Sequence, residues 1–160
     1  MTMAHRARVF WPLLSVWVAL DFITKRMAES RLTPHVPTDF LGDWVRFTLN
    51  YNTGAAMNIS LGGASRVAFT LIALVLIAVI FGMYRRTPAN ETLQPLALAL
   101  ISGGAIGNLI DRLRSVRGVV DFIDVGIGDS RFWTFNVADS GVTCGAILLI
   151  FVLWSRPNPS

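Results

Sequence analysis

The sequence has 160 residues and a net charge of +4; 53% of the residues are hydrophobic, only 15% are charged, and the mean hydropathy is +0.54. This balance excludes an ordinary soluble domain of this length and indicates a membrane protein. The basic residues are scattered over helix ends and loops, which predicts contact with a membrane surface and no nucleic-acid partner, and the single cysteine excludes a disulfide framework.

Four apolar stretches predict four membrane-spanning helices in a single integral-membrane domain of residues 1–160. The clearest stretch lies between Arg66 and Arg85 and is uncharged over close to the ~20 residues that a helix needs to cross a bilayer. The predicted spans cover residues 9–25, 65–84, 93–111 and 137–154. The first is expected to be a retained helix, because no small-residue cleavage site follows it. The predicted fold class is therefore an all-α polytopic membrane protein with four transmembrane helices.

The first span ends in two charged residues, and an extended segment follows it. Asp21 and Lys25 lie four residues apart on one helix face, which predicts a local ion pair. Residues 44–52 alternate apolar and polar side chains and predict a short strand, and residues 122–135 predict a second extended segment with turns at Gly126 and Gly128. Open strand edges cannot lie in lipid, so both segments are expected at the level of the headgroups.

The third and fourth spans carry local signals of their own. In the third, Gly103 and Gly107 lie four residues apart, a spacing that lets helices approach closely. It ends at Asp111, which adjoins Arg112 and is expected to form a salt bridge with it or to cap the helix. The fourth opens with Asn136 as N-cap and Asp139 at position N3, where a carboxylate stabilises the helix N-terminus.

The polar residues of the chain gather on one side of the predicted membrane. Consecutive spans alternate in direction, so the end of span 1, the start of span 2, the end of span 3 and the start of span 4 share that side. These are the unusually polar segments, at residues 21–25, 50–58, 107–112, 119–124 and 136–140. Ionisable groups in such positions are functional candidates, so the pattern predicts one site at one interface. The distribution of Lys and Arg leaves the orientation open.

The residues available for chemistry are carboxylates. Two histidines without metalloprotease spacing predict neither a metal centre nor another cofactor, and the ion pair accounts for the only lysine, which argues against a Ser/Lys dyad. Asp121 is the strongest candidate, because it stands alone in the apolar run VVDFI, where burial raises a pKa. The alternative is a structural carboxylate satisfied by an arginine. Asp124 and Asp129 are expected to be solvated in a loop, and Cys144 to be buried in apolar surroundings.

Three classes of function are compatible with the residues alone. If Asp121 and Asp139 meet, one can take a proton from water while the other donates a hydrogen bond to a peptide carbonyl, which is metal-free peptide hydrolysis. An ion or proton transporter would use the same aspartates with Asp21, but it would distribute polar residues through the depth of the bilayer. An assembly factor would bind partner helices through the glycine-spaced face, and it would leave the two aspartates unexplained.

Five motifs follow one another along the chain: DFITK from Asp21, NTGAA from Asn52, GGAIGNLIDR from Gly103, VVDFID from Val119 and FNVADS from Phe135. In these motifs and their order, the chain resembles the lipoprotein signal peptidases (signal peptidase II) along nearly its whole length. The resemblance implies an aspartic endopeptidase of the bacterial inner membrane, with both termini cytoplasmic and a small β-cradle and active site on the outer side. Its partners would be membrane lipid and diacylglyceryl-modified prolipoproteins, cut just before the modified cysteine by a monomeric enzyme.

The resemblance also implies roles for individual residues. Asp121 and Asp139 would be the catalytic pair, and Asp21 and Lys25 would support the site structurally. The residues that would line or shape the site are Asn52, Gly54, Asn108, Arg112 and Asn136. The chain has Met57 where the family usually has phenylalanine after NTGAA. Because methionine is also large, apolar and adaptable, we expect altered packing there and retained activity.

Overall fold

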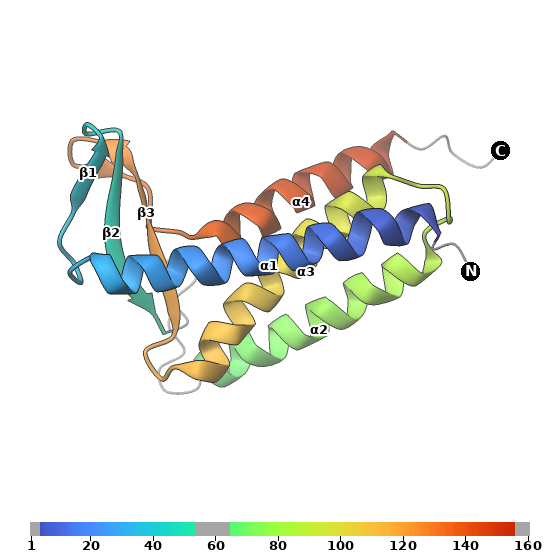
Figure 1. Ribbon diagram of the computed structural model, residues 1–160, viewed down its shortest axis with the longest axis horizontal. Helices are drawn as coiled ribbons and strands as arrows, with labels where there is room; N and C mark the ends of the chain where they lie inside the picture. The colour runs from blue at the N-terminus through green and yellow to red at the C-terminus, as the bar shows by residue number, and fades with distance from the viewer. Residues whose placement is uncertain (1–3, 54–64, 156–160) are drawn as a thin grey trace.

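The protein is described by a computed structural model that covers residues 4–53 and 65–155 (Figure 1). Four helices run lengthwise through the molecule, and each is long and apolar enough to cross a membrane, as the sequence predicts. Their bounds are α1 His5–Arg31, α2 Ser65–Arg86, α3 Leu93–Arg114 and α4 Val137–Trp154. The helix α1 extends well beyond the predicted span of residues 9–25, and its last turns lie beside the sheet in Figure 1.

Helix α3 is the centre of the bundle, because it packs against α1, α2 and α4. Small residues make these approaches possible. A Cβ atom on Gly103 would lie 3.0 Å from the Cβ atom of Trp17 on α1, and one on Gly104 would overlap the carbonyl oxygen of Ala138 on α4. A Cβ atom on Gly107 would overlap the Asp21 carboxylate. The close approach predicted from the glycine spacing is therefore confirmed, and it brings α1 and α4 together against one short stretch of α3.

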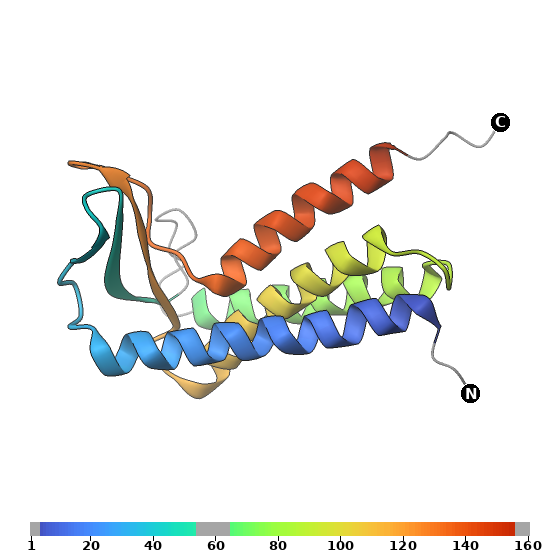
Figure 2. The same cartoon turned by 45° about the horizontal axis from the view of Figure 1, so that its top comes forward.

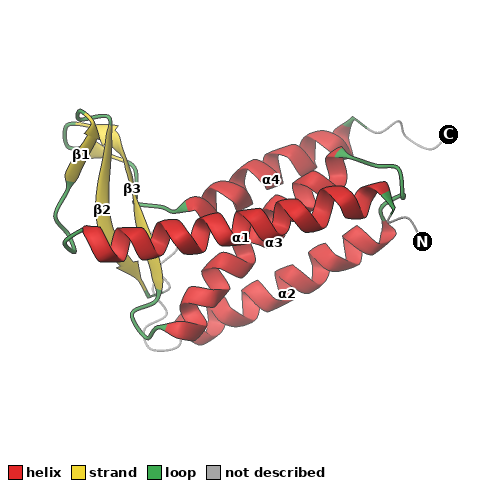
Figure 3. Ribbon diagram, in the orientation of Figure 1, coloured by secondary structure: helices red, strands yellow, loops and turns green. Residues whose placement is uncertain are grey.

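A small antiparallel sheet stands at one end of the bundle, where Figures 2 and 3 show it beside the last turns of α1. Its strands are β1 Thr38–Leu41, β2 Val45–Asn52, β3 Val119–Ile127 and β4 Ser130–Arg131, in the order β1-β2-β3-β4. The strand predicted over residues 44–52 is β2. The second extended segment starts earlier than predicted, at Val119, because the apolar run around Asp121 is itself a buried strand. Gly128 lies in the β3–β4 turn with a positive φ of 55°, whereas Gly126 lies within β3.

The position of β3 is fixed by a hydrophobic cluster between the sheet and the end of α1. Leu49 of β2, Val120 and Phe122 of β3 and Ala28 of α1 are all buried in it. Burial of these side chains is the main stabilising contribution here, at roughly 1.5–3 kcal/mol for each large one. Since Val120 and Phe122 point into this cluster, the side chain of Asp121 between them points to the opposite face of the sheet, toward α3 and α4.

Candidate active site

A groove of about 1100 Å³ lies where the sheet meets the ends of α3 and α4. Both Asp121 and Asp139 line it, although they come from a strand and a helix. The other predicted site residues on its wall are Asn52 and Arg112. A smaller pocket of about 250 Å³ between α2, α3 and α4 also reaches Asp139 and Arg112, and the rest of its lining is mostly apolar.

Asp139 is held at the first turn of α4 by a capping box. The Asn136 side-chain oxygen accepts a hydrogen bond from the Asp139 backbone N–H at 2.9 Å, and Asp139 Oδ2 accepts one from the Asn136 N–H at 3.2 Å. The predicted cap is therefore confirmed. Asp139 Oδ1 accepts a further hydrogen bond from Asn108 Nδ2 at 2.8 Å. Both carboxylate oxygens of Asp139 therefore accept hydrogen bonds from nitrogen donors.

Asp121 has the opposite kind of environment. Only 4% of its surface is exposed. Burial is the main cause that raises its pKa, the charge of Asp139 adds to it, and the pKa of Asp121 reaches about 7 despite opposing hydrogen bonds from Asn52 and Asn136 and the charge of Lys25. Among the described residues, no arginine forms a salt bridge with Asp121, so the arginine-paired alternative does not describe it.

Asn136 connects the two aspartates. Its Nδ2 atom donates to Asp121 Oδ1 at 2.6 Å and also lies 3.2 Å from the Val120 carbonyl oxygen and from Asn108 Oδ1. The same residue caps α4 and is completely buried. One asparagine therefore fixes the strand that carries Asp121 relative to the helix turn that carries Asp139.

The predicted pair of Asp21 and Lys25 is confirmed and reaches further than its own helix. Their side chains are 2.7 Å apart and each is 1% exposed. Asp21 Oδ1 accepts a hydrogen bond from the Ala138 N–H at 2.8 Å, and Lys25 Nζ donates to Asn108 Oδ1 at 2.9 Å. These two side chains of α1 thus contact the first turn of α4 and the polar end of α3.

The salt bridge predicted for Asp111 is present, but its partner is not Arg112. Asp111 instead forms salt bridges with Lys25 at 3.0 Å and Arg26 at 3.1 Å, because adjacent residues of a helix project in different directions. Arg112 Nη1 donates to the Asn108 carbonyl oxygen, and its guanidinium lies over the Phe69 ring. No carboxylate among the described residues forms a salt bridge with Arg112. Arg112 lines both pockets, so its positive charge lies at the boundary between them.

Two further predictions are wrong, and both concern surroundings that depend on distant chain segments. Asp124 is 7% exposed, not solvated, because it lies in β3 and accepts hydrogen bonds from Thr48 at 3.0 Å and Arg131 at 2.9 Å. Cys144 is exposed and lines the groove. The prediction for Asp129 is confirmed, since it is exposed in the β3–β4 turn.

Some lining residues lie outside the predicted set, and some predicted residues lie outside the described chain. Asn50 lines the groove and donates to Thr134 Oγ1 at 3.0 Å. Its position two residues before Asn52 on a strand is the signal that could have identified it, since such residues share a face. Gly54 and Met57 lie outside the described residues. Among the residues described, no three His, Cys, Asp or Glu side chains gather as metal ligands would.

Comparison with known proteins gives one consistent result. The family model described as signal peptidase (SPase) II matches residues 13–155. The chain is 44% identical over 147 residues to the lipoprotein signal peptidase of Pseudomonas putida, which covers 89% of this chain and 85% of that protein. It is 40% identical over 149 residues to that of Hydrogenovibrio crunogenus, with 91% and 86% covered. A solved bacterial membrane enzyme structure, obtained by the in meso method at 2.3 Å resolution, has a TM-score of 0.80 at 27% identity and covers 92% of this chain and 91% of its own.

Proposed function

The chain belongs to the signal peptidase II family and is a membrane peptidase that removes signal peptides from lipoproteins, and from this premise we propose that Asp121 and Asp139 activate the attacking water. The observation that carries the proposal is the contrast between the two carboxylates of one groove. Asp121 is buried with a raised pKa, whereas the Asp139 carboxylate accepts hydrogen bonds from the Asn108 amide and the Asn136 N–H and lies at the N-terminus of α4. A pair of this kind holds one proton between its members at neutral pH.

The proposed reaction follows from one carboxylate being protonated and the other ionised. Ionised Asp139 takes a proton from water as the water oxygen attacks the scissile carbonyl carbon, and protonated Asp121 donates a hydrogen bond to the carbonyl oxygen. The tetrahedral intermediate then collapses, the carbon–nitrogen bond breaks, and the amine nitrogen receives the proton that Asp139 accepted. The products are a free carboxylate on the signal peptide and a free amine on the cysteine. We propose that Arg112, Asn52 and Gly54 position the peptide, and that the dyad uses no metal or other cofactor.

The cleavage position is proposed to be just before a cysteine that carries diacylglycerol. The smaller pocket supports this, because Phe69, Ile72 and Leu76 give it an apolar wall and it meets the peptide groove at Asp139. A lipid chain can therefore remain against apolar side chains or in the bilayer while the adjacent peptide bond reaches the dyad.

A peptide-cleavage assay tests the proposed function directly. The purified protein in detergent is incubated with a synthetic prolipoprotein peptide whose cysteine carries diacylglycerol, and the products are identified by mass spectrometry. We expect a single cut before the modified cysteine and no cut in the matched peptide with a free cysteine. Equal cleavage of both peptides would contradict the proposed specificity, and cleavage of neither would contradict the function.

Activity is expected to fall as the pH rises above about 7, because Asp121 then loses the proton that it donates to the carbonyl oxygen. Well above this value, kcat/KM should decrease about tenfold for each pH unit, as for loss of a single required proton. The measurement is the initial rate of lipopeptide cleavage between pH 5 and pH 9 in a buffer series of constant ionic strength, with folding checked at each pH. A constant kcat/KM from pH 7 to pH 9 would show that no proton with this pKa is needed.

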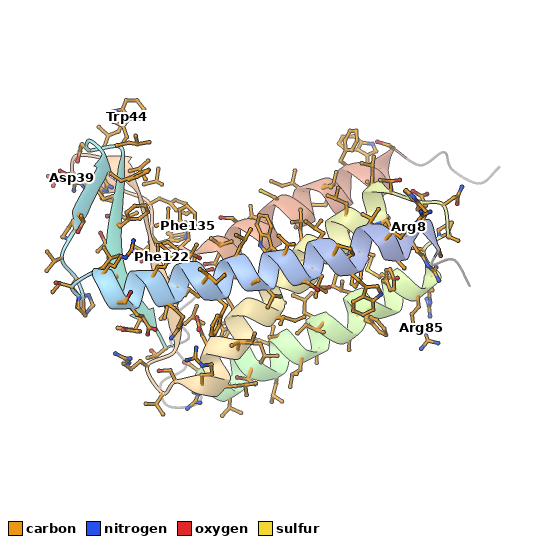
Figure 4. The ribbon with its side chains drawn as sticks, viewed as in Figure 1. Arg8, Asp39, Trp44, Arg85, Phe122 and Phe135 are labelled. Carbon is orange, nitrogen blue, oxygen red and sulfur yellow. The ribbon has the colours of Figure 1, made fainter. Side chains whose placement is uncertain are left out.

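The proposed orientation has the termini in the cytoplasm and the sheet and groove outside, in the inner membrane of a bacterium. The first residues of α1 and the last of α4 lie at the end of the bundle opposite the sheet in Figure 1. Arg8 and Arg85 lie at that same end in Figure 4, whereas Trp44 and Asp39 lie on the sheet. Basic residues in short segments favour the cytoplasmic side, which supports this orientation, and one chain supplies both aspartates, which supports a monomer.

Labelling of introduced cysteines tests the orientation. In a Cys144→Ser background, Asp129→Cys in the β3–β4 turn should react with a membrane-impermeant maleimide added to intact cells. Ala89→Cys, in the loop between α2 and α3, should react only after the membrane is permeabilised. The two positions are matched controls for each other, and the reverse pattern of labelling would show that the groove faces the cytoplasm.

A further inference from the structure

Asn108 lies between a buried ammonium group and one of the two aspartates. Its side-chain oxygen accepts a hydrogen bond from Lys25 Nζ at 2.9 Å, and its side-chain nitrogen donates to Asp139 Oδ1 at 2.8 Å. Lys25 belongs to α1, Asn108 to α3 and Asp139 to α4, so a single chain of contacts crosses three helices. Lys25, the first residue in this series of contacts, is only 1% exposed, and the proposed catalytic pair does not explain why a lysine is buried there.

The contacts of Asn108 permit only one orientation of its amide. A side-chain amide can be turned so that its oxygen and nitrogen exchange places, and its neighbours decide between the two. Lys25 can only donate hydrogen bonds, and Asn136 Nδ2, 3.2 Å away, also donates to the same oxygen. The exchanged orientation would place the NH₂ group against the ammonium and the oxygen against the Asp139 carboxylate. Both new contacts would be repulsive.

We propose that Lys25 is a positioning residue, which orients the Asn108 amide so that its NH₂ group donates to Asp139 and holds that carboxylate ionised as the base. This inference rests on the proposed function of the aspartate pair. Lys25 does not touch the groove, so it acts through Asn108 and not on the substrate. It extends the role of Lys25 beyond its salt bridges with Asp21 and Asp111.

The charged surroundings distinguish this role from simple charge neutralisation. Lys25 faces two carboxylates, Asp21 on its own helix at 2.7 Å and Asp111 on α3 at 3.0 Å. Arg26 lies at 3.1 Å from the same Asp111 carboxylate, yet no contact joins it to Asn108 among the described residues. Arg26 therefore serves as the matched control, since it provides a positive charge on the same acidic partner without the link to the amide.

A second set of charges lies around Asp139 itself. Asp121 faces it from β3 and Arg112 from α3, and both line the same groove. Neither of them contacts Lys25 through a salt bridge among the described residues, and both remain in place in the variants below. A change in titration caused by replacing Lys25 can therefore be compared in backgrounds that differ only in Asn108.

The test measures how the acidic limb of the pH profile of kcat/KM responds to substitution. Lys25→Met is expected to move that limb to higher pH by about 1 unit, the size of effect that one hydrogen bond has on a carboxylate. Arg26→Met should leave it unchanged. In an Asn108→Ala background, Lys25→Met should produce no further shift, because the amide that it orients is gone. An equal shift with and without Asn108 would show that Lys25 acts directly by charge and would overturn the proposal.

A second pair of variants covers the outcome in which Lys25→Met does not fold. Asp21→Asn is combined either with Lys25→Gln or with Lys25→Met, so the two proteins have the same charge and differ in whether position 25 can donate a hydrogen bond. We expect the acidic limb to stay near the wild-type pH with glutamine and to shift with methionine. The same shift in both would contradict the proposal.

A measurement without turnover separates this proposal from the proposed function. The ¹³Cγ resonances of labelled aspartates report the titration of the pair directly, and spectra of Asp121→Asn and Asp139→Asn assign them. The lower midpoint of the pair should move to higher pH in Lys25→Met and not in Arg26→Met. If the wild-type protein cleaves no lipopeptide but this shift is observed, the proposed function fails and the role of Lys25 stands; if cleavage occurs without the shift, the reverse holds.

Discussion

Asparagine at either position of the pair, Asp121→Asn or Asp139→Asn, is expected to lower kcat/KM for the lipidated peptide by at least about 10³-fold. Asparagine has nearly the same shape as aspartate, so it retains most packing, but it can neither take a proton from water nor exchange one with the carbonyl oxygen. At position 139 the asparagine oxygen can still accept the N–H of Asn136, so the first turn of α4 should remain capped. The loss should therefore appear in catalysis and not in folding.

The control for this prediction is Asp129→Asn, which makes the same substitution in the exposed turn between β3 and β4 and should leave cleavage unchanged. Thermal unfolding in detergent checks that all three variants fold. Wild-type cleavage should also persist in a strong chelator, because two carboxylates suffice for the proposed reaction. Near-normal turnover by either asparagine variant at the pair, or activity that is lost in chelator and restored by metal, would refute the aspartate mechanism.

Substitution of Gly104 by alanine is expected to lower the stability of the protein strongly. Its Cβ atom would overlap the backbone carbonyl oxygen of Ala138 and lie 2.7 Å from a methyl group of Val142, so α4 would have to move away from α3. Overpacking of this kind destabilises by about 1–3 kcal/mol, and backbone cannot yield as a flexible side chain can. Ala138 directly precedes Asp139, so the same movement should also displace the carboxylate and reduce cleavage by at least about tenfold.

Gly82→Ala is the matched control for the helix interior. Gly82 lies within α2, and a Cβ atom there would meet nothing within 4 Å. Alanine has the higher helix propensity, by about 1 kcal/mol, so this variant should be as stable as the wild type or more stable. The measurement is the unfolding midpoint of both variants in the same detergent. Equal stability of the two would show that α3 and α4 are not held as closely as Gly104 and Ala138 suggest.

The parts of the fold that depend on local pattern were predictable from the sequence. Hydropathy over about 20 residues identifies a membrane span whatever other elements pack against it. The alternation of apolar and polar side chains in residues 44–52 identifies β2 in the same way. The end of α1 could not be predicted in this way, because residues 26–31 lie past the apolar run. They are helical because Ala28 packs there against Leu49 and Val120 of the sheet. Its reason for being helical is tertiary packing.

The same distinction holds for the site. Asp139 could be placed from sequence, because its capping box with Asn136 is local, and Asp121 was identifiable as a carboxylate in an apolar strand. The partners of Asp111 and Asp124 could not be predicted, because they are distant in the chain. Lys25 meets Asp111 only through helix packing, and Thr48 meets Asp124 only through strand pairing. Local pattern predicts which residues are unusual, and tertiary structure determines what they contact.

The pairing of β2 with β3 has a consequence for how the enzyme is made. β2 is synthesised before α2, whereas β3 follows α3, and Asn50 is paired with Asp121 across that interval. Asp139 comes later still, in the last span. A growing chain with two or three inserted helices therefore has no complete groove and no aspartate pair. If Asp121 and Asp139 act as proposed, a chain that still lacks its fourth helix cannot cleave peptides.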